Sequence, residues 1–169
     1  MYYLLMRYFS YFLAIFAILG ASRFIPHPPN FTSLLAISFY IPFLFGRKYI
    51  PAILVSFVLT DLIIGYHLTT HWTWGSVLII GLIANYFPNK LIGRISGALS
   101  GAFIFYLITN FGVWTTGMYG ITFTGLMESY TLAIPFFSYS LLSTLIFSLV
   151  IELLIQLYFK VRKINLLKS

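Results

Sequence analysis

Apolar segments separated by short polar, glycine- or proline-containing turns account for most of this 169-residue chain. Five segments lie at about residues 3–21, 31–45, 49–65, 72–87 and 95–111, and a sixth begins between Tyr130 and Pro135 and ends near Phe159. The pattern predicts an all-α integral membrane protein with six transmembrane helices in one domain, residues 1–169. A straight crossing needs roughly 20 residues, and several segments are shorter, which suggests that their outer ends stop at a water-filled cavity.

The basic residues alternate along this series of segments. Of the ten, only Arg23 lies in one of the intervening turns. The other nine lie at alternate segment ends: Arg7, Arg47, Lys48, Lys90, Arg94, Lys160, Arg162, Lys163 and Lys168. Because basic loops resist translocation, the alternation predicts that these nine residues and both termini are cytoplasmic.

The first segment has a second interpretation, because an arginine followed by an apolar stretch also resembles a signal peptide. Its removal would leave five crossings and an external N-terminus. Leu19-Gly20-Ala21 is a poor cleavage site, so we expect the segment to remain.

Composition supports a membrane protein. Apolar residues make up 60% of the chain and charged residues 8%, against about 25% charged in soluble domains. The net charge of +7 does not indicate nucleic-acid binding, because no basic cluster is interleaved with stacking aromatics. The absence of cysteine excludes disulfides and thiolate sites. We expect no cofactor, and without a nucleotide-binding loop any use of ATP would come from partner subunits.

Two charged residues fall where membrane proteins rarely place them. Arg23 lies in the stiff proline-rich turn 22–32. Its guanidinium could lie near lipid phosphate, or it could face a ligand or pair with Asp61. Asp61, near the outer end of the third segment, is a functional candidate, and the alternative is a structural bridge to Arg23 or a cap on the next loop. Glu152 and Gln156, one turn apart in the last segment, could bond each other or a neighbour, and we expect Glu152→Gln to be milder than Asp61→Asn.

The second outer turn contains two histidines and two tryptophans. His67 and His71 are four residues apart and could join Asp61 in a metal site of two imidazoles and a carboxylate. The spacing matches no standard zinc pattern, so these are weak metal candidates and we do not expect an enzyme. Trp72 and Trp74 are typical of membrane anchors, and the alternative is that one stacks on a planar ligand.

The third outer stretch, residues 110–128, is too apolar for a solvated loop and too rich in glycine for a crossing. Long loops that still pack usually cover a binding site. Trp114, Tyr119 and Phe123 would supply aromatic walls. The predicted ligand-binding residues are Arg23, Asp61, Asn110, Trp114, Tyr119 and Glu128.

Small residues form two stripes that would allow helices to approach closely. Ala14, Ala17 and Ala21 lie on one face of the first helix, and Gly97 and Gly101 on one face of the fifth. Each stripe predicts either packing within the protein or docking to a partner subunit.

Three strings carry a resemblance to known proteins: RFIPHPPNFT at 23–32, NFGVW at 110–114 and AIPFF at 133–137. They are similar to a family of small bacterial membrane proteins, without an established function, that is catalogued as transport proteins. More distantly, the layout resembles the S-components of energy-coupling factor vitamin transporters. That resemblance implies six helices, capture of a vitamin under external loops, and docking through small residues of the first helix, here Ala17 and Ala21.

We therefore expect an S-component-like protein of the bacterial inner membrane that captures a small, vitamin-like or planar metabolite from outside. Its partners would be the lipid bilayer, the small molecule and energising membrane and ATPase subunits. The alternative is a structural or assembly subunit of a larger membrane complex, whose external motifs would be protein contacts.

Overall fold

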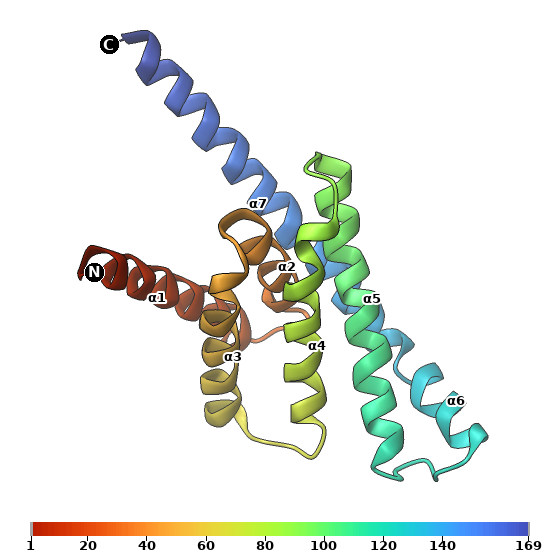
Figure 1. Ribbon diagram of the computed structural model, residues 1–169. Helices are drawn as coiled ribbons and strands as arrows, with labels where there is room; N and C mark the ends of the chain where they lie inside the picture. The colour runs from red at the N-terminus through yellow and green to blue at the C-terminus, as the bar shows by residue number, and fades with distance from the viewer. Residues whose placement is uncertain (1, 169) are drawn as a thin grey trace.

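The protein is described by a computed structural model that covers residues 2–168, with side chains from residue 6 to residue 163. The described part is helical and contains no strand (Figure 1). Its α-helices are α1 (Tyr2–Phe24), α2 (Leu34–Phe45), α3 (Ile50–Ile64), α4 (Thr70–Ile83), α5 (Leu91–Thr115), α6 (Phe123–Thr131) and α7 (Ile134–Lys168). Single 3-10 turns, Arg47–Tyr49 and Ala84–Tyr86, follow α2 and α4.

Four of the connections between the helices lie at two ends of the bundle. Residues 46–49 and 84–90 form one end, which carries Arg47, Lys48 and Lys90 and which we call the basic end. Residues 65–69 and 116–122 lie at the opposite end, which we call the cavity end (Figure 1). Tyr8 of α1 donates a hydrogen bond to the Lys48 carbonyl (3.3 Å), so the first half of α1 also approaches the basic end.

The short helix α2 lies at the centre of the bundle. It packs against α3, α4, α5 and α7, and all of its residues from Leu34 to Tyr40 are buried. One core cluster joins α2 to α1 and α3 through residues such as Leu19 and Ile53, and a second joins α2 to α4 and α5 through Phe39 and Ile80.

Helix α7 has its polar residues inside and its apolar residues outside. Ser140, Ser143, Thr144, Ser148 and Glu152 are buried in the bundle. Exposed leucines cover the outer face at positions 142, 145, 149 and 153. This distribution is the reverse of that on a helix at the surface of a water-soluble protein.

Each of the six predicted apolar segments corresponds to a helix, so the all-helical prediction is confirmed. Within the described residues, α5 and the part of α7 over Ile134–Lys163 are long and apolar enough to cross a membrane, and α2 is apolar but shorter. Six crossings remain a prediction. The glycine pair of α5 packs inside the bundle, because Gly97 lies against Phe39 and Gly101 against Ile80. The alanine stripe of α1 is exposed instead.

Candidate functional site

A buried ion pair joins α1 to α3 near the cavity end. Arg23, in the last turn of α1, donates to Asp61 Oδ1 of α3 through Nη2 (2.6 Å) and to Thr60 Oγ1 through Nη1 (2.6 Å). The indole Nε1 of Trp74 on α4 donates to Asp61 Oδ2 (2.7 Å). The guanidinium also lies over the Phe57 ring, 4.6 Å from its centroid.

These contacts decide between the interpretations of Arg23. Its side chain is 14% exposed and that of Asp61 is 8% exposed, so neither is a freely solvated surface charge. The pairing of Arg23 with Asp61, one of the alternatives that the sequence left open, is present, and the two charges neutralise each other between three helices.

Three adjoining cavities occupy the cavity end. The main cavity has a volume of about 680 Å³ and lies between the 65–69 connection, the end of α5 and the junction of α6 with α7. A side cavity of about 250 Å³ shares Asn110, Ala133 and Phe136 with it. The third, the ion-pair cavity of about 240 Å³, is lined by Arg23 and Asp61. His67 lines all three, so it marks the point where they meet.

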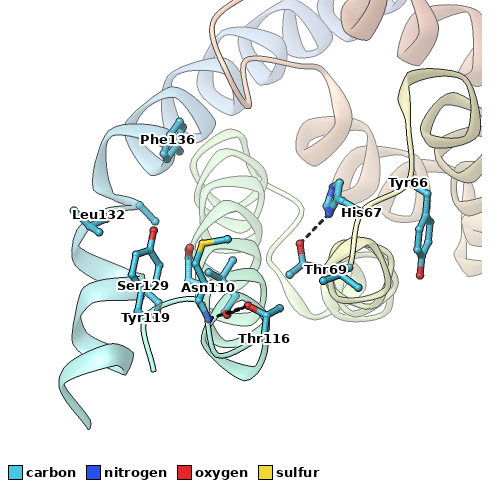
Figure 2. Close-up of a pocket in the computed structure, with 13 residues that line it drawn as sticks. Tyr66, His67, Thr69, Asn110, Thr116, Tyr119, Ser129, Leu132 and Phe136 are labelled. Atoms are coloured by element: carbon cyan, nitrogen blue, oxygen red, sulfur yellow. Dashed lines mark hydrogen bonds between the residues drawn. The ribbon is translucent and has the colours of Figure 1, made fainter. Parts of the chain in front are cut away.

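The walls of the main cavity combine aromatic and apolar side chains with a few polar groups. Figure 2 shows His67 and Thr69 on one side, Ser129 and Phe136 on the other, and Asn110 between them. Tyr66, Leu68, Met118, Tyr119 and Leu132 supply most of the remaining apolar surface. Such a mixture is typical of sites that bind small molecules.

Local hydrogen bonds position His67 in the connection between α3 and α4. Gly65 ends α3 with φ of 131°, a value that favours glycine, and its N–H donates to the Asp61 carbonyl (2.8 Å). The His67 N–H donates to Thr70 Oγ1 (3.0 Å), and the Nδ1 of its ring is paired with Thr69 Oγ1 at 2.9 Å. The ring is thereby held at the cavity wall.

Helix α6, which was not predicted, is fastened to α5 and contributes Ser129 to the wall of the main cavity. Its N-cap is Thr122, whose side chain accepts a hydrogen bond from the Gly125 N–H (3.0 Å). Tyr106 donates to the Tyr130 carbonyl (2.8 Å), and Tyr130 donates to the Leu107 carbonyl (2.7 Å).

The structure separates the predicted ligand-binding residues into two groups. Asn110 and Tyr119 line the main cavity, and Arg23 and Asp61 line the ion-pair cavity. Trp114 and Glu128 line none of the three. The reason is that residues 110–115 continue α5 and 123–131 form α6, so the loop is shorter than expected.

Three residues predicted at the site, Trp114, Phe123 and Glu128, have side chains that lie outside the cavities. Trp114 Nε1 donates to the Thr122 carbonyl (3.1 Å), which ties the 116–122 connection to the end of α5. Phe123 is 75% exposed and does not form the aromatic wall that the sequence suggested. Glu128, predicted as a polar ligand-binding group, is exposed outside the cavities.

The weak metal candidates are not brought together. Asp61 is bonded to Arg23 and Trp74, while the His71 ring is exposed beside Trp72, with ring centroids 5.5 Å apart. Within the described residues, no three histidine, cysteine or acidic side chains are grouped closely enough to hold a metal ion.

Sequence reasoning did not assign Ser129, Ala133 and Phe136 to the site, although Ala133 and Phe136 lie in the string AIPFF, which carried part of the family resemblance. It also missed a second buried charge cluster, in the half of the bundle nearer the basic end. Arg94 of α5 donates to both oxygens of Glu152 on α7 (2.6 Å each), and Tyr40 of α2 donates to Oε1 (2.9 Å). The expectation that Glu152 bonds a neighbour is confirmed, and the partner is not Gln156, which is exposed.

Comparison with known proteins gives one result. A family model described as a family of unknown function, DUF6580, matches residues 5–165. No curated protein matches the chain. No solved structure matches it either.

Proposed function

We propose that this protein, which belongs to the DUF6580 family of unknown function, crosses the bacterial inner membrane six times and captures a small, vitamin-like or planar metabolite from outside. The observation that carries the proposal is the group of cavities that meet at His67, at the end of the bundle opposite the basic connections.

The reversed polarity of α7 supports a lipid environment. Its buried face presents serines, Thr144 and Glu152, and its exposed face presents leucines. In water this arrangement would expose large apolar side chains and bury polar ones, both of which cost free energy. In a bilayer the leucines face hydrocarbon chains, and the polar groups are kept inside the bundle.

The positive-inside rule then assigns a side to each end. The connections that carry Arg47, Lys48 and Lys90 would stay cytoplasmic, as would Arg94 at the start of α5. The cavity end would therefore face outward, and the main cavity would be reached from outside.

The main cavity has the properties of a capture site. Its volume of about 680 Å³ lies within the range of roughly 300–1,000 Å³ that is usual for ligand pockets. Tyr119 and Phe136 offer aromatic surface to a planar molecule, while Asn110 and His67 offer hydrogen bonds that would fix its orientation.

The exposed alanine face of α1 supports an S-component-like mode of action. Ala14, Ala17 and Ala21 would let a helix of an energising membrane subunit approach closely, and an ATPase subunit would supply the energy for uptake. The same face also suits the second candidate function, a structural or assembly subunit. Copurification separates the two: ATPase-type partners support uptake, and a fixed complex of other enzymes supports assembly.

Reporter fusions test the topology on which capture from outside depends. Fusions after Lys48, Arg94 and Ser169 should all report a cytoplasmic position, because each follows a basic segment. A periplasmic signal at any of the three contradicts the proposed orientation.

A further inference from the structure

We propose that the captured molecule crosses the membrane through the bundle of this protein itself, along the buried polar face of α7 and past an inner gate formed by Arg94, Glu152 and Tyr40. The polar face consists of Ser140, Thr144, Ser148 and Glu152. This inference rests on the proposed capture function and adds the route by which the molecule leaves the cavities. A partner subunit would then drive the transfer without forming its path.

The polar face of α7 begins at the cavities and continues toward the basic end. Ser140 lines both the ion-pair cavity and the side cavity. Thr144, Ser148 and Glu152 follow at intervals of one helical turn, and all of these residues are buried. From Ser140 to Glu152 the helix rises by about 18 Å, which is more than half of the roughly 30 Å thickness of a hydrocarbon core. The row therefore joins the outer cavities to the inner half of the bundle.

Two hydroxyl groups in the middle of this face are suited to bind water or a polar molecule. Thr144 Oγ1 and Ser148 Oγ are buried and have no hydrogen-bond partner among the residues that the structure describes. A buried hydroxyl without a partner costs free energy unless water or a ligand binds it. Successive side chains of the row are separated by a rise of about 6 Å, and one water with two hydrogen bonds of about 2.8 Å spans that distance. The face can thus be hydrated along its length, which a polar molecule that moves along it requires.

A cluster of charged and polar groups closes the inner end of the row. Arg94 of α5 donates to both oxygens of Glu152, and Tyr40 of α2 donates to Oε1, so the cluster ties three helices together. Arg94 also donates to Oδ1 of the exposed Asn89 (2.8 Å), so the cluster lies between the polar face and the basic end. Water that reached the cluster would hydrate both charges, and separating an ion pair costs far less in water than in a dry core. The cluster can therefore hold the passage closed and still open.

Single cysteines can report which positions water reaches, because the chain has no cysteine of its own. The probe is trimethylammonioethyl methanethiosulfonate, a cationic reagent that does not cross membranes. It reacts with thiolates, so a cysteine in lipid or in a dry core stays unlabelled. Thr144→Cys and Ser148→Cys, in the full chain in inside-out membrane vesicles, should react slowly from the cytoplasmic side because the gate is closed.

Two substitutions that each remove one donor from a buried carboxylate supply the test and its matched control. Tyr40→Phe loses the hydrogen bond to Glu152 in the gate, and Trp74→Phe loses the hydrogen bond to Asp61 near the cavity end. Tyr40→Phe should raise the labelling rate of both cysteines at least about tenfold, the factor that one hydrogen bond to a charged group typically contributes to an equilibrium. Trp74→Phe should leave the rate unchanged. Arg94→Lys keeps the charge but loses the two-pronged contact, so it should act like Tyr40→Phe and tests the gate if that variant does not fold.

Two further cysteine positions separate a passage from general loosening of the bundle. Ala52→Cys lies in the other core cluster, in the first turn of α3 beside the basic end, and Leu149→Cys lies on the apolar outer face of α7. Neither should react in any of the variants. The passage is overturned if the gate variants leave Thr144→Cys and Ser148→Cys unlabelled, or if Ala52→Cys becomes reactive to the same extent.

Ala133→Cys tests the capture function apart from the passage, because Ala133 lines the main and side cavities. It should react with the same reagent added outside right-side-out vesicles. If it does so while the gate variants have no effect, the outward-facing cavity stands and only the route is wrong. If Ala133→Cys reacts from the cytoplasmic side alone, the orientation is wrong and the capture function fails with it.

Discussion

The chain has three acidic residues, and the structure predicts that removing their charges one at a time will have unequal effects. Asp61→Asn would leave Arg23 buried without its counter-ion, although the guanidinium would keep Thr60 and the Phe57 ring. Breaking a buried pair by removing one partner costs about 3–5 kcal/mol. Because Arg23 retains these contacts and is 14% exposed, we expect about 3 kcal/mol, at the lower end of this range.

Glu152→Gln should cost at least as much. The Glu152 side chain is 3% exposed and accepts hydrogen bonds from Arg94 and Tyr40. The structure thus removes the reason for expecting this change to be the milder one. Glu128 is exposed, and Glu128→Gln should change stability by less than about 0.5 kcal/mol, which makes it the matched control.

Thermal unfolding of the three variants in one detergent, followed by tryptophan fluorescence, measures these differences. The double variant Arg23→Gln/Asp61→Asn should be more stable than the sum of the two single changes predicts, because the partners are in contact. If Asp61→Asn unfolds at the same temperature as Glu128→Gln, the buried ion pair is not a stabilising feature and the reasoning is refuted.

Two further predictions concern the end of α5. A Cβ at Gly112 would overlap the Trp72 side chain, so Gly112→Ala should destabilise the protein by about 1–3 kcal/mol in the same unfolding assay. Gly75 lies in a helix with open space around it, so Gly75→Ala should be neutral or stabilising. Trp114→Phe keeps an aromatic ring but loses the hydrogen bond to Thr122, so it should increase proteolytic cleavage in the 116–122 connection. The unfolding temperature should fall by no more than a few degrees. Unchanged cleavage would show that this bond does not hold the connection.

The helices could be predicted because apolar segments and their boundaries are local properties of the sequence. Gly46 and Pro88 interrupt the hydrophobic pattern near the ends of α2 and α4. The short helix α6 was missed because glycines at 112, 117, 120 and 125 resemble a loop, although Thr122 is a usual N-cap residue that could have indicated its start.

The charge pairs show where prediction from sequence stops. Arg23 and Asp61 are 38 residues apart, but the predicted helices alternate in direction and place both residues near the same end of the bundle. Their pairing could therefore be named as one of the alternatives for each residue. Arg94 and Glu152 are 58 residues apart, and the position of Arg94 was already explained by topology. The meeting of the cavities at His67 depends on how the helices α1 to α7, all of which contribute lining residues, pack together, and no local pattern determines that packing.

Native mass spectrometry of the gently purified protein tests the central claim, capture of a small molecule in the main cavity, most directly. Ala133→Phe would fill space at the wall shared by the main and side cavities, and Ala17→Phe makes the same change on the exposed face of α1. We predict an additional small-molecule mass on the native protein and on Ala17→Phe that is lost from Ala133→Phe. A native protein that carries no small molecule, or one that Ala133→Phe retains in full, would contradict the proposed capture site.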